Sequence, residues 1–162
     1  MKKYKKIVSA LLSIMLIFCL NVVAFADEYP YDLGKEIDGS KLTNEHESES
    51  TIYNRTRGNF LNSGVARLTD MGGGTVNSYG AVVGAVVCDK MVLEMTLQRL
   101  EGSTWVTVKT YSNTSYNTSL LTKSYNLSVK KGYYYRLKAA CVAFEGGTSE
   151  SQMPVTNGIW IG

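Results

Sequence analysis

The sequence predicts an all-β domain, and three observations carry that prediction. Downstream of residue 52, apolar and polar residues alternate in short runs with a period of two, which is typical of strands. Gly, Asn and Ser separate these runs at the spacing of turns, and no stretch has the period of a helix. A hydrophobic content of 44% and a charged content of 19% in 162 residues support a packed core and exclude a wholly disordered chain.

The first 26 residues have the three parts of a secretory signal peptide. Four lysines lie within Met1–Lys6, an apolar run follows over Ile7–Leu20, and Ala24-Phe25-Ala26 precedes Asp27. We therefore expect cleavage between Ala26 and Asp27, a secreted (extracellular) chain and no stable membrane span after cleavage. The alternative is an uncleaved membrane anchor, since the apolar run is close to the length of a span.

Residues 27–51 form an acidic segment with a net charge of −6, whereas the region from residue 52 carries +5. We predict that 27–51 is a flexible, disordered arm and that 52–162 is the folded β domain. The alternative is that the arm folds back on the basic domain and masks it until it is removed, with Arg55–Gly58 as a candidate processing point. After signal cleavage the chain has a net charge of −1, so its overall charge does not point to nucleic acid.

Eight strands are expected in order along the domain. Their ranges are Ile52–Arg57, Val65–Asp70, Thr75–Val83, Met91–Leu100, Trp105–Tyr111, Leu120–Val129, Tyr133–Phe144 and Met153–Ile161. The clearest is Met91–Leu100, in which Met, Leu, Met and Leu at every second position make one apolar face. The Gly-containing link Glu101–Thr104 then predicts a hairpin with Trp105–Tyr111.

The second clear strand, Tyr133–Phe144, follows the turn Lys130–Gly132 and reads Tyr-x-Tyr-Arg-Leu-x-Ala from Tyr133. This stretch resembles the corner before strand F of fibronectin type III and other immunoglobulin-like sandwiches. The resemblance covers about residues 91–139 and implies an immunoglobulin-like β-sandwich of seven to eight strands. It also implies that Tyr133 is the corner tyrosine, which hydrogen-bonds back to the preceding backbone, and that Met91–Leu100 and Tyr133–Phe144 pair as strands C and F. The chain departs from the pattern because it lacks the usual tryptophan on strand B.

The whole chain also resembles a group of small exported proteins of clostridia and related Firmicutes, which carry a domain of unknown function. The shared features are Thr56-Arg57-Gly58, Tyr79-Gly80, Gly132–Arg136 and the ending Asn157–Ile161. The resemblance implies export from a Gram-positive cell and no known activity.

Two cysteines, Cys88 and Cys141, remain once Cys19 leaves with the signal peptide. An even number in an exported domain predicts one disulfide, and the C/F placement brings the start of one strand beside the end of the other. Cys88 and Met91 are an odd number of residues apart, so on a regular strand Cys88 would point away from the inward face of Met91. A bulge would be needed to bring the Cys88 side chain inward. The alternative is two free, buried thiols.

No catalytic, metal-binding or cofactor-binding residues are predicted, and we expect a protein that is not an enzyme. The single histidine, His46, lies among glutamates in the acidic arm, where a solvated side chain is the ordinary outcome. Gly72-Gly73-Gly74 lacks the lysine of a phosphate-binding loop, and no nucleophile elbow is present. An enzyme on a sandwich scaffold stays as a minor alternative.

The positive feature is a set of tyrosines and tryptophans in the second half of the chain. We predict a binding surface on the outward side of the strand from Tyr133, made by Tyr134, Arg136 and Lys138 with Trp105. Exposed aromatic rings stack on sugars or contact protein partners, so the expected ligand is a cell-wall or host glycan, or a protein surface. The alternatives are tyrosines that merely pack on strands, and a secreted bacteriocin-like effector whose acidic arm masks a basic β domain.

Overall fold

The computed structural model describes residues 34–54 and 60–162 of the chain. The predicted signal peptide and its cleavage site at Ala26–Asp27 lie outside the described residues, as does the candidate processing point Arg55–Gly58. No helix in the described residues is long and apolar enough to cross a membrane.

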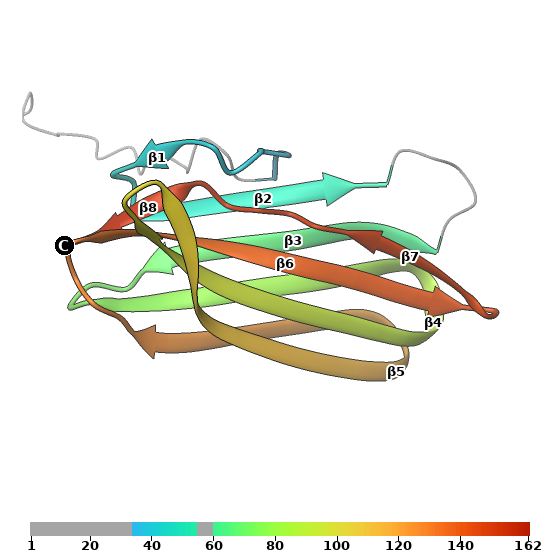
Figure 1. Ribbon diagram of the computed structural model, residues 1–162. Coiled ribbons are helices and arrows are strands. Elements are labelled where there is room, and N and C mark those ends of the chain that lie inside the picture. The colour runs from blue at the N-terminus through green and yellow to red at the C-terminus, as the bar shows by residue number, and fades with distance from the viewer. Residues whose placement is uncertain (1–33, 55–59) are drawn as a thin grey trace, which may run out of the picture.

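The described chain is all-β, as the sequence predicts, and its strands form one eight-stranded sheet (Figure 1). The strands are β1 (Leu42–Thr43), β2 (Glu47–Tyr53), β3 (Leu61–Asp70), β4 (Thr75–Glu101), β5 (Thr104–Ser128), β6 (Tyr133–Glu145), β7 (Thr148–Gln152) and β8 (Gly158–Ile161).

A long hairpin of β4 and β5 connects the two halves of the sheet. The sequence predicts two separate strands within each of them, but β4 runs for 27 residues and β5 for 25. The predicted break at 84–90 contains a bulge and no end of a strand, because the register between the two strands shifts between Val83 and Cys88 while both strands continue. Asn117, which lies on β5 next to this bulge, has a φ of 49°, so the hairpin bends here without a turn.

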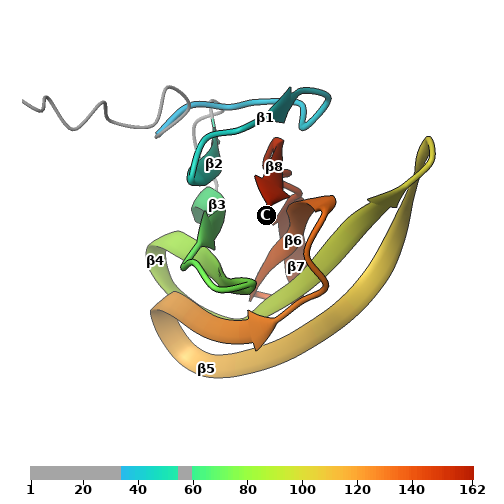
Figure 2. The same ribbon diagram turned by 90° about the vertical axis from the view of Figure 1, so that its left-hand side faces the viewer.

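The bend gives the sheet a sandwich-like shape. The first half of β4 pairs with β3, and its second half pairs with β6. We call β2, β3 and the adjoining halves of β4 and β5 the β2 layer; β1, β6, β7, β8 and the other halves form the β6 layer. Figure 2 shows the sheet curled so that the two layers face each other. The predicted pairing of Met91–Leu100 with Tyr133–Phe144 is also confirmed.

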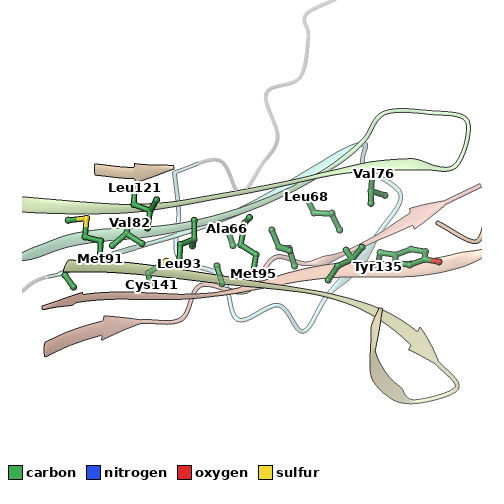
Figure 3. Packing of buried hydrophobic residues seen from close by; sticks show 14 of the residues in the cluster. Ala66, Leu68, Val76, Val82, Met91, Leu93, Met95, Leu121, Tyr135 and Cys141 are labelled. Carbon is green, nitrogen blue, oxygen red and sulfur yellow. The ribbon is translucent and has the colours of Figure 1, made fainter. Parts of the chain in front are cut away.

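The core fills the space between the layers (Figure 3). The predicted apolar face of β4 is confirmed, because Met91, Leu93, Met95 and Leu97 are all 0% exposed. They pack in one cluster with residues of the β2 layer such as Leu68 and with residues of β6. Burial of each large side chain stabilises the fold by roughly 1.5–3 kcal/mol.

The prediction of a disordered arm over 27–51 is wrong for its described part, because residues 42–43 and 47–53 are strands of the domain. Glu49 explains how an acidic segment is held, since its side chain is only 6% exposed and lies 2.6 Å from Nη2 of Arg67. Its Oε1 accepts hydrogen bonds from the Gly34 N–H at 2.9 Å and the Thr51 hydroxyl at 3.0 Å. The folded domain therefore begins before residue 52, and charge composition failed as a guide because this carboxylate is paired.

The predicted Cys88–Cys141 disulfide is wrong as well, since both cysteines are free and buried. The register pairs Cys141 with Leu93, five residues along β4 from Cys88. Five strand residues span about 16 Å, whereas a disulfide needs Cα atoms within about 7 Å. Burial raises the pKa of the Cys141 thiol to about 12, and burial followed by the charge of Glu145 raises that of Cys88.

Candidate binding surface

The predicted surface residues of β6 do share its outward side. Tyr135 and Leu137 are fully buried, so the alternation of the strand turns Tyr134, Arg136 and Lys138 away from the core. Each of these three outward side chains is half-buried. The sequence pattern sufficed to predict which side chains of β6 point outward, because alternate residues of a strand that covers a core point away from that core.

Trp105 joins this surface from the tip of the β4–β5 hairpin. The guanidinium carbon of Arg136 lies 4.3 Å from the centre of the Trp105 ring, a cation–π contact. A Cβ on Gly158 would lie 2.8 Å from Cη2 of Trp105, so the indole rests directly on the glycine of β8. Trp105 therefore has a structural role, because it packs the hairpin tip against β6 and β8.

Trp160, which the sequence analysis left out of the surface, lies beside Tyr134. The two residues are register partners on β8 and β6, and their ring centres are 5.0 Å apart with planes at 63°. Trp160 is 41% exposed, whereas Ile159 and Ile161 on either side of it are fully buried. The alternation in Gly158–Ile161 was the signal that would have placed Trp160 outward.

We call Trp105, Tyr134, Arg136, Lys138 and Trp160 the aromatic–cationic face. Arg136 is held by its Nε, which donates to Oε1 of Gln98 at 2.9 Å, and by its Nη1, which donates to the Gly39 carbonyl at 3.3 Å. Burial lowers the pKa of Arg136. Within residues 34–54 and 60–162, no carboxylate forms an ion pair with Arg136 or Lys138. Among the described residues, the two cations therefore place positive charge on an aromatic surface without an acidic partner.

The structure assigns the corner hydrogen bond to Tyr135 and not to Tyr133. The Tyr135 hydroxyl donates to the Lys130 carbonyl at 2.6 Å, five residues upstream. Tyr133 begins the strand, and its ring lies 4.7 Å from the guanidinium of Arg99 and 5.2 Å from the ammonium of Lys130. The prediction for Tyr133 is wrong: Tyr133 lies on the same side of β6 as Tyr135, but its half-buried ring contacts these two cations, and the Tyr135 hydroxyl makes the corner hydrogen bond.

Other aromatic residues of the second half serve packing. The rings of Tyr111 and Tyr125, from the two ends of β5, stack with centres 4.3 Å apart. The Tyr125 hydroxyl donates to Oδ1 of Asn113 at 2.7 Å. Both rings are partly buried against the core and come from opposite halves of β5, so the packing alternative holds for these two tyrosines.

The outward side of the β2 layer differs in chemistry. Arg67 is paired with Glu49 there, and its guanidinium also lies 5.3 Å from the centre of the Tyr79 ring. Partial burial disfavours the charged form of Arg67, but the hydrogen bond and charge of Glu49 outweigh it and raise the pKa of Arg67. Nearby, Nδ2 of Asn77 donates to Asn126 at 2.6 Å and to Ser124 at 2.8 Å.

No group of three or more metal-ligating side chains is present in the described part of the chain. His46 contributes its backbone carbonyl, which accepts a hydrogen bond from the Asp70 N–H at 2.7 Å.

No curated protein matches the sequence. Among solved structures, the sporulation control protein Spo0M from Bacillus subtilis is similar with a TM-score of 0.32 and 10% identity. The alignment covers 73% of this chain and 51% of that protein, so the chain spans about half of its length. A family model described as "Family of unknown function (DUF6147)" matches residues 35–159, and the chain belongs to this family.

Proposed function

We propose that the protein is a secreted, non-enzymatic binding protein that holds a glycan through its aromatic–cationic face. The observation that carries the proposal is the pair of outward rings of Trp160 and Tyr134 next to Arg136. Aromatic faces stack on the apolar faces of sugar rings, and a rigid sheet places them without loss of side-chain freedom on binding.

The charges narrow the ligand class. Arg136 and Lys138 lie on the same side of β6 as Tyr134 and form no ion pair among the described residues. An anionic glycan, with carboxylate, phosphate or sulfate groups, would offer both sugar rings for stacking and acceptors for these cations. The signal-like first 26 residues support an extracellular ligand of this kind. A protein surface with acidic side chains is the second candidate ligand, because its carboxylates would also pair with Arg136 and Lys138.

The effector-precursor alternative gains less support. It needs an acidic segment that can be removed, whereas β2 pairs with β3 over seven register positions. Loss of this strand would leave the edge of β3 without hydrogen-bond partners and would leave Arg67 without Glu49. We therefore favour the binding function over the effector precursor.

The test is a binding screen of the chain, expressed from its full gene, against neutral and anionic cell-surface polysaccharides. We expect binding to anionic members that weakens at least about tenfold in Tyr134→Ala and in Trp160→Ala, since an aromatic contact of this kind contributes about 1.4 kcal/mol or more. Raising the salt concentration is expected to remove part of the affinity through screening of Arg136 and Lys138.

A matched control is Tyr53→Ala, because Tyr53 is an exposed tyrosine (54%) on β2, in the other layer. This variant is expected to bind as the parent chain does. Absence of binding to every polysaccharide, or equal loss in the Tyr53 and Tyr134 variants, would rule out the proposed face.

A further inference from the structure

The outer edge of β5 is the longest uncovered strand edge in the described structure. β5 pairs with β4 on one side, and no other described strand pairs with it. Figures 1 and 2 show β5 along the outside of the curled sheet. Since every second residue of an edge strand turns both its N–H and its C=O outward, this edge offers a row of donors and acceptors to another strand.

The other edges of the sheet are covered or short. Along β2, the Thr51 N–H donates to the Lys35 carbonyl at 2.7 Å, so the preceding segment lies against that edge. β8 carries β1 on its outer side, and β7 has only five residues. Within residues 34–54 and 60–162, the edge of β2 is thus covered and the much longer edge of β5 is open.

The composition of β5 does not protect this edge. Soluble proteins block exposed edges with charged side chains or proline, but β5 has no Pro, Gly, Asp or Glu, and its only charges are Lys109 and Lys123. Ser, Thr and Asn make up 14 of its 25 residues. Among its large side chains, Tyr116 is 68% exposed.

A regular run of eight residues, Lys109–Tyr116, is the part of β5 that suits strand pairing. It begins after Val108, where the register with β4 shifts between Leu97 and Gln98. It ends before Asn117, whose φ of 49° starts the bend. Eight residues span about 27 Å, which is longer than the mean strand of five to six residues.

We propose that this run binds the same run of a second copy of the chain, antiparallel, about a two-fold axis near Ser112. The segment matches itself in this arrangement. Thr110 would lie opposite Thr114 of the other copy, and Ser112 opposite Ser112, all on the outward side, where Thr and Ser pairs stabilise sheets by about 0.2–1 kcal/mol each. Lys109 would lie opposite Ser115, so no lysines face each other.

A second copy fits this edge better than an unrelated strand for two reasons. Both partners would use the same edge, so the contact is self-complementary and closes into a dimer. The pairing would also extend the β6 layer of one copy into that of the other, placing two aromatic–cationic faces on one continuous sheet. The proposal does not depend on what those faces bind.

The test is the molar mass of the chain, expressed from its full gene, measured by sedimentation and light scattering over a wide range of concentrations. We expect a monomer–dimer equilibrium. In Ser112→Lys and in Ser112→Glu, like charges would meet at the axis, and the dissociation constant is expected to rise at least about tenfold. Mixing the two variants in equal amounts should restore the dimer, because Lys then faces Glu.

The matched controls are Ser151→Lys and Ser151→Glu, which place the same charges on an exposed position of β7. These variants should dimerise as the parent does, and circular dichroism should be the same for all five proteins. A monomer at every concentration would overturn the proposal. So would a dimer that both Ser112 variants leave intact, or one that the mixture fails to restore.

Discussion

The outward sides of the two layers use the same residue types in opposite ways. On the β2 layer, Arg67 is paired with the buried carboxylate of Glu49. On the β6 layer, Arg136 lies over the ring of Trp105 and bonds to neutral oxygens of Gln98 and Gly39. The first cation is neutralised by its own chain, and the second keeps its positive charge on an aromatic surface.

This difference teaches that composition alone does not identify a binding face. Both outward sides carry arginine beside an aromatic ring, as Arg67 with Tyr79 illustrates. What separates them is where the acids lie, because Glu47 and Glu49 of β2 lie next to Arg67, whereas, among the described residues, Arg136 meets the same acidic segment only at the Gly39 carbonyl. We therefore expect substitutions on the β2 side to change stability and substitutions on the β6 side to change binding.

The largest effect is expected from Glu49→Ala. The change leaves the Gly34 N–H, the Thr51 hydroxyl and the partly buried guanidinium of Arg67 without their acceptor. We expect a loss of about 2–3 kcal/mol in the free energy of unfolding, measured by urea denaturation, with no change in ligand affinity. Glu47→Ala is the comparison, because the Glu47 side chain is more exposed (21%), lies 3.9 Å from Nε of Arg67 and accepts one hydrogen bond, from the Thr69 hydroxyl at 2.6 Å; its expected loss is about 1 kcal/mol. Equal losses in both variants would contradict the role of Glu49.

Trp105→Ala is expected to act on both properties. It removes the contact of the indole with Arg136 and with Gly158, which holds the hairpin tip. We expect a loss of roughly 2 kcal/mol in unfolding free energy, below that of a fully buried tryptophan, together with weaker glycan binding. The neighbouring exposed Thr107→Ala is the control and should change neither. A Trp105 variant with parental stability would show that the hairpin tip holds its place without the indole.

Tyr135→Phe tests the corner hydrogen bond. It removes only the hydroxyl that donates to the Lys130 carbonyl, and the expected loss is about 1 kcal/mol. Tyr133→Phe should leave stability unchanged, because the Tyr133 ring keeps its contacts with Arg99 and Lys130. Thermal unfolding of both variants is the measurement, and a larger effect at Tyr133 would restore the original assignment.

The smallest effect is expected from Cys141, in the core between the two faces. Its thiol has an ordinary pKa of 9.0, which burial raises to about 12 in the folded chain. Between these values the unfolded chain loses its proton and the folded chain keeps it, so stability falls as the pH rises above 9. At pH 9.5 the loss from this group is about 0.8 kcal/mol. Denaturation of the parent and of Cys141→Ala from pH 8 to 10 is the measurement, and the variant should have the shallower decline.

The sequence was a good guide where a residue's place depends on its immediate neighbours. Alternation predicted the buried side of Met91–Leu97 and the outward side of Tyr134 and Arg136, because adjacent strand residues must point in opposite directions. Short Gly-containing links predicted the hairpin that leads into β5. The same alternation in Gly158–Ile161 places Trp160 outward between two buried isoleucines.

The sequence was a poor guide where distant segments decide the outcome. An even number of cysteines predicted a disulfide, but the register places Cys141 of β6 opposite Leu93, five residues along β4 from Cys88. The acidic segment appeared disordered because its charge was summed without Arg67, which lies 18 residues after Glu49. Tyr133 and Tyr135 cannot be told apart until the end of the layer is known.

By itself, the sequence determined the all-β class, the strand faces and most of the aromatic–cationic face, because these follow from the two-residue period of a strand. Only the tertiary structure decided that β4 and β5 continue through a bend and that β2 belongs to the domain. It likewise decided which outward cation meets a carboxylate. The physical reason is that register, curvature and ion pairing depend on contacts between segments far apart in the chain. Local sequence patterns do not determine these contacts.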